Sequence, residues 1–410
     1  MGGHLERLEA LSEQISGYIY PNEIELHWGL LVVLYPYITG LVAGAFILAS
    51  LEKVFKVKEV EPTYRLSLLT ALAFLLVAPL PLLAHLGHPE RSFEIFLTPH
   101  FKSAMAMFGF VYAWYLMLVL LLELWFEYRA DLVRWSRSES GLKKLVHVVI
   151  TLGSRDLSPK AVAFDQKAVH AITLVGIPSA FLLHGSVGFI FGSVKANPWW
   201  SSVLMPIVFL FSAIVSGISL VLILYYVATL VRRKAPDMAC LDKLASFLLY
   251  ALIVDVSLEV LDFIHRLYES EESIGILSEL IFSRLFISLT IVQILIGTIG
   301  PLLLLAVSRF SQLPAELKRV TYFIAALLVQ VGIFSTRWNV VIGGQLFSKS
   351  LRGLTVYKVE LGGIEGLFTS LALLVLPFLI LYVLIKVLPP WEEDRPLEPE
   401  SEIAATTAGE

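Results

Sequence analysis

Long apolar stretches separated by short polar segments dominate the chain. Nine of them are long enough to cross a lipid bilayer as helices, since one crossing needs about 20 residues. They cover residues 27–51, 65–87, 101–127, 167–193, 201–230, 244–265, 278–307, 320–345 and 365–388. The pattern predicts an all-α integral membrane protein with about nine transmembrane helices.

The polar segments at the two ends predict smaller features. Between residues 4 and 18, leucine and isoleucine recur at helical spacing among charges, which favours an amphipathic helix within residues 1–26. Residues 389–410 are rich in Pro, Glu and Ala, and this composition is typical of a disordered tail. The long polar linker 128–166 is expected to hold a short surface helix around residues 141–152.

One apolar stretch carries an unusual set of charges. Asp255, Glu259, Asp262 and Arg266 are spaced 4, 3 and 4 residues apart, so on a helix they form a single stripe. An ionisable group inside a bilayer costs about 2.5–3.5 kcal/mol, so such groups face a bundle interior and pair or carry protons. The stripe therefore predicts a proton path at Asp255, Glu259 and Asp262, or a structural ladder of ion pairs.

A cation in the next stretch is expected to take part in this stripe. Arg284 and Glu259 each lie about six residues inside their predicted spans, roughly 9 Å deep. The two helices are consecutive and antiparallel, so the sequence predicts an ion pair between Glu259 and Arg284. His184, Arg337 and Asn339 are also expected inside the bilayer, nearer to the same side.

Charges in the connecting segments predict the orientation. Segments on one side of the nine spans contain 21 Lys and Arg residues, and those on the other side contain 8. Positive residues are enriched on the cytoplasmic side. We therefore expect a protein of the cytoplasmic membrane with its N-terminus outside and its C-terminus in the cytoplasm.

Composition excludes several classes of protein. The 410 residues are 57% hydrophobic and 16% charged, with a mean hydropathy of +0.77, whereas soluble domains are about 25% charged. A net charge of −4 without a long basic block gives no reason to expect nucleic acid binding. Cys240 is the one cysteine, so this chain cannot ligate an iron–sulfur cluster, which needs four ligands.

Several motifs, in order along residues 27–345, resemble the NrfD-like membrane subunits of polysulfide reductases, especially the branch of the hydrogenase-2 membrane subunit. They are GLVAGAFILAS in the first span, HLGHPERSF after the second, GIPSAFLLHGSVGFIFG in the fourth, PWWSSVLMPIVFLFSAIVSGISL leading into the fifth, and RWNVVIGGQ ending the eighth.

This resemblance implies a fold and a set of functional residues. The fold would be two consecutive four-helix up-and-down bundles, residues 27–193 and 194–345, with residues 346–388 adding a loop and a further helix. A quinone, menaquinone or another, would bind near the outer surface. His27 matches the family's histidine at the start of the first helix, and His184 stands where the family has a tyrosine. Arg337 and Asn339 complete the expected quinone site.

The resemblance also implies partners. An iron–sulfur, ferredoxin-like subunit would dock on the outer face, with a catalytic oxidoreductase subunit beyond it. His88, Glu90 and Arg91 in the loop after the second span are candidates for that contact. This chain would hold neither haem nor an iron–sulfur cluster.

The resulting hypothesis is a quinone-reactive subunit of a respiratory oxidoreductase of the sulfur, polysulfide or hydrogenase type, with or without proton translocation. One alternative is a haem b cytochrome, because several of the nine histidines fall within the bilayer. His170 and His184 are about 21 Å apart along one helix, so they cannot share a haem. The other alternative is a secondary transporter, although such folds commonly show inverted repeats and broken helices.

Overall fold

The computed structural model of the chain describes residues 14–98, 100, 102–103, 114–269 and 273–391. Within these residues, eight helices are long and apolar enough to cross a membrane. They are α2 (Leu30–Lys53), η2 (Lys58–Val60) continuing into α3 (Glu61–Val77) and α4 (Leu80–His85), α9 (Pro159–Gly192), α10 (Met205–Val231), α11 (Met238–Glu269), η7 (Phe286–Ile299) with α13 (Gly300–Phe310), α14 (Ala315–Val341) with η8 (Gly343–Gln345), and α15 (Leu367–Val387). The all-α membrane fold is confirmed.

The predicted third span, residues 101–127, lies partly outside the described residues, which omit 104–113. Its described part is helical, as the π-helix η4 (Tyr115–Leu120) followed by α7 (Leu121–Ser138). Eight helices plus this segment agree with about nine spans. The surface helix expected around residues 141–152 is present as α8 (Gly141–Ile150).

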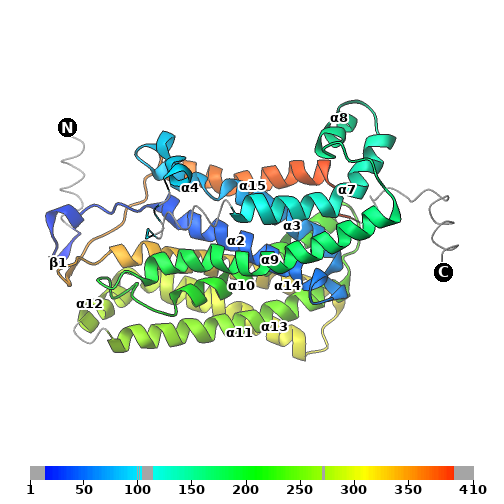
Figure 1. Ribbon diagram of the computed structural model, residues 1–410. Helices are drawn as coiled ribbons and strands as arrows, with labels where there is room; N and C mark the ends of the chain where they lie inside the picture. Colours follow the sequence, from blue (N-terminus) through cyan, green and yellow to red (C-terminus); the bar gives the residue numbers. More distant parts are fainter. Residues whose placement is uncertain (1–13, 99, 101, 104–113, 270–272, 392–410) are drawn as a thin grey trace.

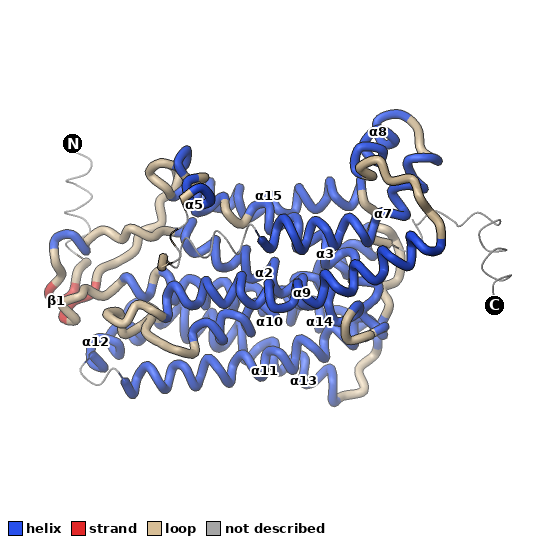
Figure 2. Tube along the Cα trace, viewed as in Figure 1, coloured by secondary structure: helices blue, strands red, loops and turns tan. Residues whose placement is uncertain are grey.

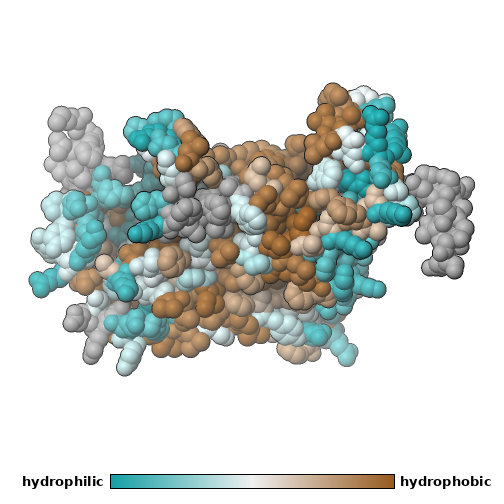
Figure 3. Space-filling view, viewed as in Figure 1, coloured by the Kyte–Doolittle hydropathy of each residue, from teal (hydrophilic) through white to brown (hydrophobic). Residues whose placement is uncertain are grey.

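The long helices lie side by side with their axes roughly parallel (Figure 1). A small sheet of β1 (Ser16–Tyr18) and β2 (Arg352–Leu354) lies at one end of the bundle, and α8 lies at the other. Hydrophobic residues cover the middle of the visible face, and hydrophilic residues gather at both ends (Figure 3). This banding is what a bundle crossing a bilayer requires. We call the two ends the sheet end and the α8 end.

Short elements and loops connect the helices at these ends (Figure 2). Residues 16–18 form β1, although the sequence favoured a helix over residues 4–18. Pairing with β2 in an antiparallel register overrides the local helical spacing there. Residues 1–13 and 392–410, parts of the predicted amphipathic and disordered segments, lie outside the described residues. The remaining short elements are η1 (Pro21–Glu23), η3 (Pro89–Arg91), α5 (Glu94–Leu97), α12 (Ile274–Glu279) and the π-helix η6 (Leu280–Arg284).

α2 is buried along nearly all of its length and packs on α3, α9, α10 and α14. Small residues permit this packing. A Cβ atom added at Gly44 of α2 would lie 2.0 Å from the carbonyl oxygen of Ala213 in α10, so the two backbones are in contact. Gly297 in η7 and Gly332 in α14 meet in the same way. Membrane helices use such contacts because apolar burial alone drives little association in lipid.

Contacts between neighbouring helices suit the expected division into two units. α2, α3, α7 and α9 pack among themselves, as do α10, α11, η7 with α13, and α14. The two groups touch through α10 and α14, both of which pack on α2. The division of the chain at residues 193 and 345 stays a prediction.

Candidate functional site

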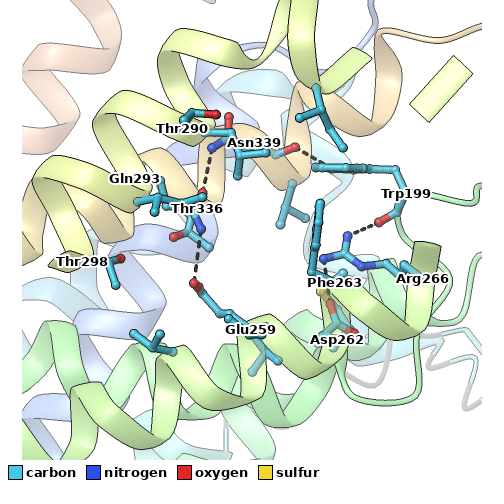
Figure 4. Close-up of a pocket in the computed structure, with 18 of the residues that line it drawn as sticks. Trp199, Glu259, Asp262, Phe263, Arg266, Thr290, Gln293, Thr298, Thr336 and Asn339 are labelled. Atoms are coloured by element: carbon cyan, nitrogen blue, oxygen red, sulfur yellow. Dashed lines mark hydrogen bonds and ion pairs between the residues drawn. The ribbon is translucent and has the colours of Figure 1, made fainter. Parts of the chain in front are cut away.

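A cavity of about 380 Å³ lies between α10, α11, η7 and α14, below the loop that carries Trp199 (Figure 4). Most of its walls are apolar, with Phe209 and Phe263 among them. A few polar side chains enter it: Glu259, Asp262, Arg266, Thr290, Gln293, Thr298, Thr336 and Asn339. An apolar cavity with a few fixed polar groups is the usual form of a small-molecule site, and such sites measure about 300–1,000 Å³.

The cavity reaches the lipid-facing surface between α11 and the segment η6–η7. Three of its lining residues, Val260, Phe282 and Ile294, are also exposed, at 51%, 72% and 40%. Val260 and Ile294 belong to membrane-spanning helices, so the exposed parts of their side chains face acyl chains, and Phe282 lies in η6 just before the second of these helices. An apolar ligand dissolved in the bilayer can therefore enter the cavity without crossing water.

A chain of hydrogen bonds ends at the cavity wall. Ser288 Oγ donates to Asn339 Oδ1 at 2.6 Å, and Asn339 Nδ2 donates to Gln293 Oε1 at 2.7 Å. Gln293 Nε2 then donates to Glu259 Oε2 at 3.3 Å (Figure 4). The second oxygen of Glu259, Oε1, is buried and has no hydrogen-bond partner in the described part of the chain. A buried polar atom without a partner at a cavity wall is suited to a ligand or a proton.

The other charged groups at the cavity are already paired. Arg266 lies 2.7 Å from Asp262, and Asp262 also accepts a hydrogen bond from Ser202. The guanidinium donates to the carbonyl oxygen of Trp199 and lies 5.0 Å from the centre of its ring. Asp262 and Arg266 therefore fix the Trp199 loop over the cavity, whereas Glu259 has an oxygen to spare.

A second polar cluster lies behind the cavity, within the helix core. Arg337 is fully buried; its Nη2 donates to Ser212 Oγ at 2.5 Å and lies 3.2 Å from His184 Nε2. The Arg337 guanidinium and the His184 imidazole both lie against the ring of Phe209, at 4.2 Å and 5.7 Å from its centre. Phe209 also lines the cavity, whereas His184 and Arg337 do not, so this ring separates the two clusters.

The structure does not bring His27 to His184. His27 is exposed and borders a separate groove of about 240 Å³ at the sheet end, beside Asn197 and Gln345. His184 packs against Gly40, ten residues inside α2 or roughly 15 Å along its axis. The two histidines therefore lie at different depths and cannot hold one ring between them.

The predicted ion pair between Glu259 and Arg284 is wrong. Arg284 is half-buried, and its Nη2 donates to the backbone oxygen of Gln14 at 2.6 Å. Gln293 lies level with Glu259 instead, so Arg284, nine residues earlier in the same segment, is closer to the sheet end. Asp255, one turn before Glu259, is buried, and its Oδ1 has no hydrogen-bond partner among the residues described.

The loop residues expected to face a partner are exposed near the sheet end. His88 Nδ1 lies 3.0 Å from Glu90, and Arg91 pairs with Glu94 at 2.9 Å. They belong to η3 and its flanks, directly before α5, and Figure 2 shows α5 on the opposite side of the bundle from α11. Their contact with a partner stays a prediction. Across the described residues, no three His, Cys, Asp or Glu side chains gather to hold a metal ion.

Comparison with known proteins identifies the family of this chain. Residues 21–349 match the family described as "Polysulphide reductase, NrfD". The chain belongs to the NrfD family. The match covers most of the described helices, including every helix that lines the cavity.

Two curated relatives of this NrfD protein are reductase subunits by name. A selenate reductase subunit of Mesobacillus selenatarsenatis is 32% identical over 323 residues, which cover 77% of this chain and 73% of that protein. A putative dimethyl sulfoxide reductase membrane subunit of Halobacterium salinarum is 29% identical over 208 residues, 49% of this chain and 43% of that protein. This NrfD chain is accordingly a membrane subunit of an oxidoreductase.

Proposed function

We propose that the chain is the quinone-reactive subunit of an oxidoreductase complex and that the quinone ring binds in the cavity between α11 and η7. The observation that carries this proposal is a cavity open to lipid with a spare carboxylate oxygen, Glu259 Oε1, at its wall. Quinones dissolve in the bilayer, so a lipid-facing mouth is the access that such a substrate needs. Menaquinone or another quinone suits the apolar walls equally.

The cavity residues fit the requirements of quinone chemistry. A bound quinone or quinol supplies transfer of two electrons and two protons. Such chemistry needs hydrogen-bonding groups at the ring oxygens and a group that exchanges protons. The amides of Gln293 and Asn339, held by the chain from Ser288, fix the polar wall. Glu259 accepts or releases a proton at Oε1, while Phe263 and Phe209 exclude water.

Protons need a route beyond Glu259. Asp255 lies one turn deeper on the same face of α11 and has an oxygen to spare, so it is the next proton carrier in our proposal. Arg337 behind Phe209 provides a fixed positive charge on this side of the core. In this proposal His184 and Arg337 do not touch the quinone, because the Phe209 ring lies between them and the cavity. His27 has no role at this cavity. Whether protons cross the membrane is a separate part of the proposal.

The proposal also includes the partner subunits of this chain and the side of the membrane on which they dock. Electrons would pass between the cavity and an iron–sulfur subunit docked at the sheet end, beyond which lies a catalytic subunit. The cavity lies directly beneath the Trp199 loop at that end. The electron path from a subunit docked there to a quinone in the cavity would therefore be short. We place the sheet end outside the cytoplasmic membrane, in agreement with the charge bias of the loops. The relatives act in selenate and dimethyl sulfoxide reductases by name, and a sulfur or hydrogenase partner is equally compatible with this chain.

Blocking the mouth tests the proposal. Val260→Trp fills the opening between α11 and η6, whereas Val254→Trp places the same ring on an exposed position of α11 that does not line the cavity. We expect the complex carrying Val260→Trp to lose co-purifying quinone and quinone-linked turnover, and the complex carrying Val254→Trp to retain both. Full turnover in the Val260→Trp complex would reject the cavity as the quinone site.

A further inference from the structure

A second buried carboxyl lies in the other group of helices, near the α8 end. Glu123 on α7 is fully buried, and its Oε1 accepts hydrogen bonds from Thr173 Oγ1 at 2.8 Å and from the Tyr64 hydroxyl at 3.4 Å. Its Oε2 is buried without a hydrogen-bond partner among the described residues. Nothing in the quinone proposal uses this group.

Within the described residues, no cation pairs with Glu123, because the cations around it pair with other carboxylates. Arg65 of α3 pairs with Glu127 and Asp131 at 2.8 Å each, and Lys53 of α2 pairs with Glu127 at 3.5 Å. The other titratable groups near Glu123 and its pocket are Tyr115 on η4, Glu52 on α2, Lys56 after α2, Glu61 and Tyr64 on α3, Arg134 on α7, and Asp165 and His170 on α9. Burying an unpaired carboxylate is costly, and binding a proton removes that charge.

The α8 end of the bundle is open to within one helical turn of Glu123. A polar pocket of about 480 Å³ opens between the ends of α2, α3, α7 and α9, and Tyr64, Glu127 and Val169 line it. Glu127 lies four residues after Glu123, and Val169 four before Thr173. Tyr64 belongs both to the pocket and to the hydrogen bonds of Glu123. Its hydroxyl can receive a proton from pocket water and release its own to the carboxylate.

We propose that Glu123 is a proton-binding site that exchanges with water at the α8 end through this pocket and Tyr64. A hydronium ion in the pocket gives one proton to the Tyr64 hydroxyl and remains as water, while the proton that Tyr64 releases forms the O–H bond at Glu123, so the carboxylate becomes neutral with no change in electron count. Its role as an uptake point during turnover rests on the proposed quinone function, whereas the exchange itself does not. The polar pocket admits protons, and the cavity at Glu259 admits an apolar substrate.

Infrared spectroscopy of the purified complex in H₂O and D₂O tests the site. We expect a protonated-carboxyl band that shifts on transfer to D₂O and is lost in Glu123→Gln, which keeps the acceptor for Thr173 and Tyr64. The matched control, Glu61→Gln, removes an exposed carboxylate at the pocket mouth and should keep the band. A band that is unchanged in Glu123→Gln, or that does not shift in D₂O, would overturn the proposal.

Two further variants serve if Glu123→Gln cannot be purified or if the quinone proposal fails. Thr173→Val removes one hydrogen bond but leaves the carboxyl, so it should shift the band without abolishing it; an unshifted band would contradict the assignment even if Glu123→Gln cannot be purified. Val260→Trp should keep the band while losing quinone. Loss of the quinone function therefore leaves the Glu123 test intact, and the two proposals can fail separately.

Discussion

Two polar clusters lie on either side of the Phe209 ring, and they differ in whether a ligand from the membrane can reach them. On one side, Glu259, Gln293 and Asn339 face a cavity with an exposed, lipid-facing mouth. On the other, His184, Arg337 and Ser212 are buried among α2, α9, α10 and α14, where Arg337 contacts His184 and Ser212, and Ser212 donates to the Phe209 backbone oxygen. A histidine and an arginine within a membrane suggest chemistry, but a substrate can meet only the first cluster.

The comparison gives each polar group a different test. A residue at the open cavity should change turnover while leaving the fold intact, and one in the enclosed cluster should change stability first. A charged residue outside both should change little. Three substitutions, one at each kind of position, test this distinction.

Glu259→Gln should reduce quinone-linked turnover about 100-fold, because general acid–base groups contribute about 10²–10⁴-fold and the amide carries no exchangeable acid proton. Assembly should be retained, since Glu259 is bonded to Gln293 and not paired with Arg284. Steady-state rates and the yield of purified complex measure the two effects. Glu269→Gln, an exposed change at the end of the same helix, is the control. A low yield with a normal rate per complex would show that Glu259 is structural.

His184→Leu should mainly destabilise the protein. The leucine removes one of the two partners of Arg337 Nη2, leaving Ser212 Oγ, so a buried guanidinium is less satisfied, at a cost of about 1–3 kcal/mol. We expect a lower thermal denaturation midpoint and a smaller loss of turnover than in Glu259→Gln. If His184→Leu abolished turnover at an unchanged midpoint, the enclosed cluster would have to touch the substrate, and Phe209 could not be the wall that separates the two clusters.

Arg284→Gln should have the smallest effect. The side chain is half-buried at the sheet end and bonded to a backbone oxygen of the N-terminal segment, and changes at such positions alter stability by about 0.5 kcal/mol or less. Yield and turnover should match the wild-type values. A complex that fails to assemble with this variant would restore the ion pair that the sequence suggested.

The helices and the stripe of charged residues on α11 could be predicted from the sequence, because the length of an apolar stretch and the helical spacing of its charges are local properties. α11 does place Asp255, Glu259 and Asp262 on its inner side. The partners of these residues could not be predicted. The depth of a residue in the membrane does not determine how the neighbouring helix is rotated about its own axis, and so which of its side chains face α11. η6 and η7 are π-helical, which alters the facing of every later residue and brings Gln293 to Glu259.

The sequence also could not show which polar residues a ligand can reach. The patterns for His184 and Asn339 are alike, a polar residue within an apolar helix, yet only Asn339 lines the cavity. The ring of Phe209, from a third helix, makes that difference. Arg266 and Trp199 were also missed as cavity residues, although the Trp-containing loop was noted for its resemblance. Their contact joins a loop to a helix 67 residues later, and no local signal reports it.

Labelling with a photoreactive quinone tests the central claim most directly. The complex would be irradiated with the probe in membranes, digested, and the labelled residues mapped by mass spectrometry. We expect labels on α11 and η7, around Val260 and Ile294, that are competed by unlabelled quinone and absent from the Val260→Trp complex. Labels confined to the groove beside His27, or to α9 around His184, would contradict it.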